Sequence, residues 1–213
     1  MTASTDTLVV VEHPLVHHKL TLLRDRSTTT RDFRQLVGEL TVVLCYEATR
    51  DLELEAVDVD TPLERAPGWR ISGKKLGIVA VMRAGAGMLD ALLDLIPGAR
   101  VGFVGLYRDE ETLRPVEYYS KLPSDLAERD VLVLDPMLAT GGTAAAAVAL
   151  CKERGARRIS LLCIVAAPEG VRRLAEAHPD VVVYACALDR GLNEHGYILP
   201  GLGDAGDRLF GTR

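Results

Sequence analysis

Five continuous apolar runs are the feature of this sequence that most restricts its possible folds. They lie at residues 76–82, 101–106, 131–134, 159–166 and 181–186. Each run is far too short to cross a bilayer as a helix. Strands that are apolar on both faces are typical of parallel sheets that helices cover on both sides. The runs therefore predict a buried, mostly parallel sheet.

Helix-length segments separate the last three runs. They occupy residues 143–154 and 168–178. Strands and helices that alternate at steps of about 25 residues predict βαβ crossovers, and therefore a doubly wound α/β fold. The chain has 213 residues, with no internal repeat and no linker-like segment. We therefore expect residues 1–213 to form a single domain.

The two ends of the chain follow other patterns. Before the first run, apolar residues recur at helical spacing behind a cap-prone segment at 27–30, and they are Phe33, Leu36, Val37, Leu40, Val43 and Leu44. Residues 52–59 alternate with acidic residues, as in a half-exposed strand. The tail at 191–211 is rich in glycine, yet it contains large apolar residues such as Tyr197 and Phe210. We expect this tail to be packed rather than frayed.

Charge and cysteine usage exclude some classes of protein. The formal net charge of −5 argues against a surface that binds nucleic acid backbones. The amino terminus lacks the features of a signal peptide, and nothing predicts a membrane association. Cys45, Cys151, Cys163 and Cys186 are scattered, without the spacing of a metal site. We expect them to be buried and reduced, which suits the cytoplasm.

A loop of small residues after the third run predicts a phosphate site. The run 131–134 ends at Asp135, and four alanines follow the loop. The loop residues are Pro136, Met137, Leu138, Ala139, Thr140, Gly141, Gly142 and Thr143. Ligands of α/β sheets bind at such strand ends, and a helix N-terminus favours phosphate. We expect Asp135 to accept hydrogen bonds from ribose hydroxyls, and a branched side chain at Gly142 to block the phosphate. The alternative is a tight turn without a ligand.

The loop resembles that of a known family. Asp-Pro-Met-Leu-Ala-Thr-Gly-Gly at 135–142 is similar to the phosphoribosyl-pyrophosphate loop of type I phosphoribosyltransferases, and of the uracil branch in particular. Other branches usually carry a second acidic residue where Pro136 stands. The resemblance extends over nearly the whole chain, including residues 13–15, 19–25 and 196–208. It implies the type I phosphoribosyltransferase fold, with an N-terminal helical segment, a flexible hairpin arm and a C-terminal hood.

Two arginines follow apolar runs at further turns. Arg83 begins a glycine-rich turn, and its planar guanidinium suits a diphosphate. Arg108 lies in the charged, aperiodic segment 107–119, which is typical of an exposed hairpin or lid. The resemblance implies that both arginines bind the activated sugar, and that 107–119 is the flexible catalytic loop. The alternatives from the residues alone are a surface charge and a solvated loop.

The tail is the segment that surrounds the base in the resembling enzymes. The resemblance places main-chain groups of Ile198, Gly203 and Ala205 on uracil, and Asp204 near the sugar and magnesium. It makes Asp135, Asp204 and Arg108 the catalytic residues. The alternative is a packed loop with a purely structural role. None of the five histidines has the spacing of a zinc or triad site, and we interpret all of them as structural or solvated.

The resemblance implies transfer of the phosphoribosyl group of 5-phospho-α-D-ribose 1-diphosphate (PRPP) to uracil, giving UMP and diphosphate. Mg²⁺ would be held mainly through PRPP and water, without dedicated protein ligands. We expect a homo-oligomer, either dimer or tetramer, for which the early apolar helix is a candidate interface. Activation by a purine nucleotide such as GTP corresponds to no motif. Alternatives are a purine or orotate phosphoribosyltransferase, and a nucleotide-sensing regulator on this fold that binds RNA.

Overall fold

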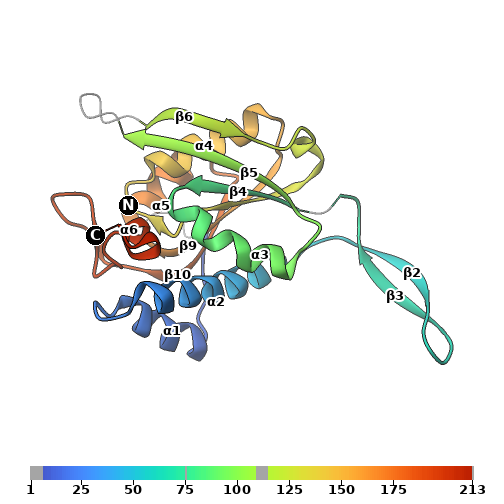
Figure 1. The fold of residues 1–213 in the computed structure, drawn as a ribbon. Helices are drawn as coiled ribbons and strands as arrows, with labels where there is room; N and C mark the ends of the chain where they lie inside the picture. Colours follow the sequence, from blue (N-terminus) through green and yellow to red (C-terminus); the bar gives the residue numbers. More distant parts are fainter. Residues whose placement is uncertain (1–6, 75, 109–114, 213) are drawn as a thin grey trace.

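The computed structural model describes residues 7–74, 76–108 and 115–212. Their helices and strands alternate along most of the chain (Figure 1). The strands are β1 Leu8–Val10, β2 Leu54–Asp60, β3 Arg65–Ile71, β4 Gly77–Met82, β5 Arg100–Arg108, β6 Pro115–Lys121, β7 Asp130–Leu134, β8 Met137–Leu138, β9 Arg158–Ala166, β10 Val182–Leu188, β11 Gly191–Leu192 and β12 Ile198–Leu199. The helices are α1 Pro14–Arg24, α2 Thr30–Ala48, α3 Leu89–Leu95, α4 Gly142–Glu153, α5 Pro168–Ala177 and α6 Ala205–Phe210, with short 3₁₀ helices η2 Ala84–Met88 and η3 Leu126–Glu128.

The main sheet is mostly parallel. Its strand order is β1-β10-β9-β7-β4-β5-β6, and β8 pairs with β9 beyond the end of β7. All neighbours in this order are parallel except β6, which runs antiparallel to β5. The five apolar runs form β4, β5, β7, β9 and β10. The prediction of a mostly parallel α/β sheet is therefore confirmed.

Helices cover both faces of this sheet, so the fold is doubly wound. Neighbouring residues of one strand, such as Ile78 and Val79, belong to different apolar clusters on opposite faces. The first cluster includes buried residues of α1, α2 and α3, and the second includes those of α4 and α5. Figure 1 shows α1 and α2 lying together on one side of the sheet. This two-sided burial explains why the strands are continuously apolar.

The early helix begins where its cap residues predicted. The Thr29 hydroxyl accepts a hydrogen bond from the backbone N–H of Asp32, and α2 follows directly. Phe33, Leu40 and Leu44 are fully buried in the core of the same chain. Their apolar face is therefore not available for the subunit interface that the sequence suggested. Of the helices in the described ranges, none combines the length and the apolar character that a membrane crossing needs.

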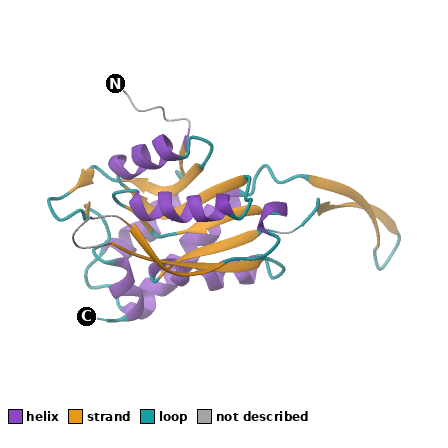
Figure 2. Ribbon diagram, turned by 90° about the horizontal axis from the view of Figure 1, so that it is seen from above, coloured by secondary structure: helices purple, strands orange, loops and turns teal. Residues whose placement is uncertain are grey.

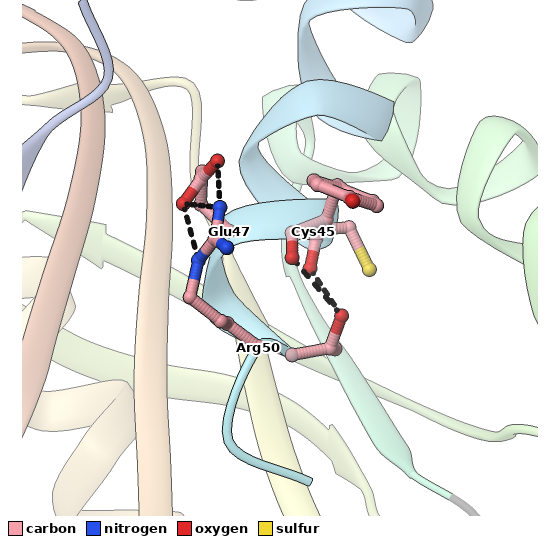
Figure 3. Close-up of polar contacts among 5 residues, drawn as sticks. Cys45, Glu47 and Arg50 are labelled. Atoms are coloured by element: carbon pink, nitrogen blue, oxygen red, sulfur yellow. Dashed lines mark hydrogen bonds and ion pairs between the residues drawn. The ribbon is translucent and has the colours of Figure 1, made fainter.

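The C-terminal end of α2 contains the first cysteine (Figure 3). The hydroxyl of Thr49 donates to the carbonyl of Cys45 at 2.7 Å, and Arg50 pairs with Glu47 at 2.8 Å. All four cysteines are buried and free. Burial raises the pKa of Cys45 to about 11 and that of Cys151 to about 12. These thiols stay protonated at neutral pH, and they act as core residues, as predicted.

Two antiparallel hairpins depart from the simple alternation. The first, β2–β3, projects from the body of the molecule (Figures 1 and 2). Its first strand was predicted with one buried face, but nearly all of its residues are exposed. Its second strand was not predicted, because Pro67 and Gly68 disfavour a strand. The second hairpin, β5–β6, is the one that the sequence predicted. Its expected flexible tip, and the side chain of Arg108, lie outside the described residues.

Candidate active site

The loop after β7 continues the sheet before it turns into a helix. Asp135 donates its backbone N–H to the carbonyl of Leu162. The carbonyl of Pro136 accepts from Ile164 and Val165, and β8 then pairs with β9. Pro136 and Leu138 are buried, and both of their carbonyls are used within the sheet. Their part in the loop is therefore to hold its backbone in place.

The N-terminus of α4 offers unpaired backbone donors. Gly141 is its cap residue, and among the described residues no side chain caps the helix. The first N–H groups of a helix have no partner inside the helix, and they carry a partial positive charge. Thr140 and Thr143 flank this end with hydroxyl groups. The arrangement suits a phosphate.

The two glycines of the loop have different roles. Gly141 has a φ of +77°, and a Cβ there would lie 2.6 Å from the carbonyl oxygen of Gly170 in α5. Gly142 begins the helix, and the side-chain atom nearest to a Cβ there would be in the guanidinium of Arg173, at 3.4 Å. The sequence interpretation expected a branched side chain at Gly142 to block the phosphate, and this stays a prediction. Of the two glycines, Gly141 has the left-handed conformation that favours glycine.

A second turn packs against the end of β7. Arg83 follows β4, and the Met82–Arg83 peptide bond is cis. A Cβ on Gly85 would collide with the backbone carbonyl of Leu134, so glycine allows the turn to approach β7 closely. The Arg83 side chain is 57% exposed, and its Nη2 lies 3.3 Å from Asp207 Oδ1. Arg83 therefore lies between the strand ends and α6.

The C-terminal tail folds back over the strand ends, as predicted. It forms the small β11–β12 pair and then α6. Asp204 caps α6, because its Oδ1 accepts from the backbone N–H of Asp207 at 2.9 Å. Leu202 and Leu209 are buried in the core. The tail is thus part of the folded structure.

A cavity of about 340 Å³ joins the phosphate loop to the tail. Asp135, Met137 and Ala139 line it from the sheet side. The predicted tail residues on its wall are Ile198, Gly203, Asp204 and Ala205. Thr140 lies next to this wall, since its Cγ2 is 3.8 Å from the position of a Cβ on Gly196. Arg83 is not on the lining, but its neighbour Ala84 is.

The sequence interpretation did not identify some lining residues. His195, Gly196 and Gly206 also face this cavity, together with Tyr197. His195 was interpreted as structural or solvated. Its position directly before Gly196 was the signal that the sequence offered. The other four histidines do not line this cavity, and His178 contacts the backbone carbonyl of Ala145.

Asp135 has an unusual electrostatic environment. The residue is half-buried, and this burial raises the pKa of its carboxyl group to about 7. The only opposing contribution is a long hydrogen bond of 3.5 Å from the N–H of Met137. Near neutral pH, the carboxyl group is therefore divided between its protonated and ionised forms. Hydroxyl donors of a bound sugar would favour the ionised form.

The carboxylates of the cavity suit a metal ion that arrives with a phosphate ligand. In the described ranges, no three His, Cys, Asp or Glu residues are grouped so as to hold a metal ion. Asp135 and Asp204 nevertheless line the same cavity. Mg²⁺ is commonly held by one or two carboxylates together with substrate phosphates and water. The donor set fits such a magnesium ion.

Comparison with known sequences gives one family. The model of the family "Uracil phosphoribosyltransferase" matches residues 10–212. A uracil phosphoribosyltransferase of Symbiobacterium thermophilum is 59% identical over 206 residues, which cover 97% of this chain and 99% of that protein. One from Bacillus thuringiensis has the same identity and coverage. These relatives do not favour the RNA-binding alternative.

Comparison with solved structures agrees with this result. The AQ2163 protein from Aquifex aeolicus has a TM-score of 0.90 at 38% identity, over 95% of this chain and 97% of that one. A hypoxanthine-guanine phosphoribosyltransferase from Bacillus anthracis has a TM-score of 0.52 at 13% identity, over 75% of this chain and 80% of that one, and it supports the fold alone. The chain belongs to the uracil phosphoribosyltransferase family.

Proposed function

We propose that the cavity between the phosphate loop and the tail is the active site, where the phosphoribosyl group of PRPP passes to uracil. The products are UMP and diphosphate. The observation that carries this assignment is the convergence of three features on one cavity. Asp135 at a strand end, loop residues Met137 and Ala139 just before the uncapped N-terminus of α4, and the tail around Gly203 all line it. This cavity can hold a phosphate, a sugar and a base in sequence.

The phosphate and sugar positions follow from the loop. Backbone N–H groups at 139–143 and the hydroxyls of Thr140 and Thr143 would bind the 5′-phosphate. Asp135 would accept hydrogen bonds from the ribose hydroxyls. Arg83 is exposed beside the cavity and would bind the diphosphate, together with Arg108. Asp204 would lie near the sugar and its magnesium ion.

The base position follows from the tail. Ile198 and Ala205 line the cavity although both are only 3% exposed. The side chain of Ile198 belongs to the core, so its main chain is what it can offer to a ligand. Gly203 has a φ of +73° and no side chain to cover its peptide groups. The three residues therefore suit recognition of uracil through main-chain groups.

The reaction forms a bond between a uracil ring nitrogen and the anomeric carbon while the bond to diphosphate breaks, and the proton of that nitrogen passes to the departing diphosphate or to water. Positive charge develops on the sugar, and negative charge develops on the departing diphosphate. The Asp135 carboxylate offsets the first, and the arginines offset the second. Mg²⁺, when bound, adds charge neutralisation at the diphosphate. The main task of the chain is to align both substrates, because well-oriented reactants account for a large share of a rate enhancement.

Release of diphosphate tests this assignment directly. The full chain is mixed with PRPP, magnesium and uracil, and diphosphate and UMP are measured. We expect both products in equal amounts, and neither without magnesium. Hypoxanthine, guanine and orotate are the control bases. Faster turnover of any of these bases would overturn the assignment of uracil.

Replacing Asp135 is expected to change stability and activity in opposite directions. In the folded protein its pKa is raised to about 7 from 3.8, so the folded state retains a proton that the unfolded state has lost between these pH values. Wild-type stability therefore falls as the pH rises from about 4 to 7. Asp135→Asn removes this loss, so the variant should be the more stable protein at pH 8, as thermal melts would detect. Its catalytic efficiency should fall about 10- to 150-fold, from a lost charge-assisted contact of about 1.5–3 kcal/mol. Equal activity would contradict the proposed role.

We further propose that residues 1–213 fold as one domain that assembles into a homo-oligomer in the cytoplasm. The four reduced cysteines support a reducing compartment. Exposed apolar side chains on the β2–β3 hairpin support assembly. Leu54 is 55% exposed and Trp69 is 72% exposed. The two residues lie on one face of the hairpin, and apolar groups that are exposed together mark contact sites between proteins.

A further inference from the structure

An ion pair joins the start of the chain to its end. The guanidinium of Arg24, at the end of α1, pairs bidentately with Asp189, directly after β10. The two hydrogen bonds are 2.9 and 2.6 Å long. The Asp189 side chain is 5% exposed, and that of Arg24 is 23% exposed. Such a pair has one preferred geometry, because the guanidinium is planar and binds the carboxylate at two points.

Both members of this pair also bind Gly201 in the tail. The Nη1 of Arg24 donates to the Gly201 carbonyl at 2.9 Å, and the Gly201 N–H donates to Asp189 Oδ2 at 2.9 Å. Gly201 has a φ of +63°, and a Cβ there would collide with the carbonyl of Ile198. Both polar groups of this one peptide residue are therefore fixed. Asp189 is itself held to the sheet, because its N–H donates to the carbonyl of Ala166.

A third charged side chain holds the next residue. Arg208 donates to the carbonyl of Leu202 at 3.0 Å and to that of Asp25 at 2.6 Å. Its guanidinium lies 4.2 Å from the ring centroid of Phe33. The tail backbone at 201–202 is thus bound by two arginines, between Ile198 on one side and Gly203 on the other.

Both arginines contact the tail from a second cavity. Arg24 and Arg208 line a second cavity, of about 430 Å³, and Gly203 and Asp204 line both this cavity and the proposed active site. Both arginines donate to backbone carbonyls, and Arg24 also donates to Asp189. Their contacts therefore make them supports of the wall between the two cavities.

We infer that Arg24 and Asp189 are positioning residues that set the tail backbone for uracil recognition. The inference rests on the proposed base pocket at Ile198, Gly203 and Ala205. Peptide groups of the tail can match uracil only if their direction is fixed, and a misplacement of about 1 Å can cost about 10²-fold in rate. Gly201 lies three residues from Ile198 and two from Gly203. The pair controls the position of both.

The test compares the effect of a substitution on the KM for uracil with its effect on the KM for PRPP. Arg24→Lys keeps the positive charge but loses the two-point geometry. We expect the KM for uracil to rise about tenfold or more, from weakened charge-assisted bonds. The KM for PRPP should change less than about threefold, because no side-chain hydrogen bond or ion pair found among the described residues joins this pair to the loop at 135–143. An equal change in both KM values, or no change in either, would overturn the inference.

A double variant separates positioning from stability. Replacing a buried ion pair by apolar residues of similar size is often neutral for folding. Arg24→Met with Asp189→Leu leaves no unpaired buried charge, but the N–H and C=O of Gly201 lose these partners. The variant should therefore melt below the wild type but above either single variant, and in its folded state it should still show a raised KM for uracil. A wild-type KM for uracil in this folded variant would overturn the inference.

The matched control removes a similar pair elsewhere. Arg50 pairs with Glu47 through three hydrogen bonds of 2.8 to 3.1 Å, at the end of α2 (Figure 3). The Arg50 side chain is 61% exposed, and it lines neither cavity. Arg50→Lys should leave both KM values unchanged. A wild type that fails to use uracil would overturn the base pocket itself and the positioning role with it. A wild type that uses uracil, with no split in Arg24→Lys, would overturn the positioning role alone.

Discussion

Uracil is expected to be used at least about 10⁴-fold more efficiently than cytosine, because a pocket of main-chain groups cannot adapt to the second base. Uracil presents an acceptor at position 4 and a donor at position 3, whereas cytosine reverses both. Peptide groups of Ile198, Gly203 and Ala205 are fixed by the backbone, unlike an amide side chain that can rotate. Cytosine would therefore leave buried donors facing donors. The measurement is kcat/KM for each base at saturating PRPP.

Side-chain variants of the tail test the main-chain origin of this preference. Ile198→Val removes one methylene group from the core side, and it should lower stability by about 0.5–1.5 kcal/mol. The ratio of uracil to cytosine efficiency should stay within about threefold of the wild type. Removing the whole tail would not be informative, since Leu202 and Leu209 belong to the core. A ratio near one in the wild type would contradict the proposed base pocket.

The core strands could be predicted because the apolar residues that are buried in them are consecutive in the sequence. A strand that is covered on both faces is apolar at every position, as in 131–134, and such runs need no knowledge of the partner strands. Strand β3 could not be predicted in this way. It lies outside the core, it contains Pro67 and Gly68, and only its pairing with β2 makes it a strand. Strand β8 has two residues, and it depends on β9 in the same way.

The features of the candidate site also differ in whether the sequence alone could predict them. Asp135 and the small residues after it are adjacent in the sequence, so their chemistry could be predicted from the chain alone. The contact of Arg24 with Asp189 joins residues 165 positions apart, and no local pattern indicates it. No local pattern indicates the left-handed φ of Gly141 either. Two consecutive glycines look equivalent in a sequence, and only the path of the backbone into α4 distinguishes them.

Gly141→Val is expected to reduce the affinity for PRPP by about 10²-fold or more. A left-handed conformation costs an ordinary residue about 1–2 kcal/mol, and a branched residue more. A Cβ at this position would also lie 2.6 Å from the carbonyl oxygen of Gly170. Either the loop or α5 must move, and the N–H groups at the start of α4 lose their common direction. Calorimetric titration with PRPP and magnesium measures the affinity, and a thermal melt confirms that the variant is folded.

Gly142→Ala is the matched comparison, because the neighbouring glycine has neither constraint. Its backbone is helical, and its added Cβ would meet the end of the flexible Arg173 side chain at 3.4 Å. Alanine also favours a helix over glycine by about 1 kcal/mol. We therefore expect a much smaller loss of affinity, below about tenfold. If both variants lose affinity equally, a side chain at position 142 obstructs the phosphate and the strain at Gly141 is not the cause. If folded Gly141→Val binds PRPP as the wild type does, the phosphate lies elsewhere.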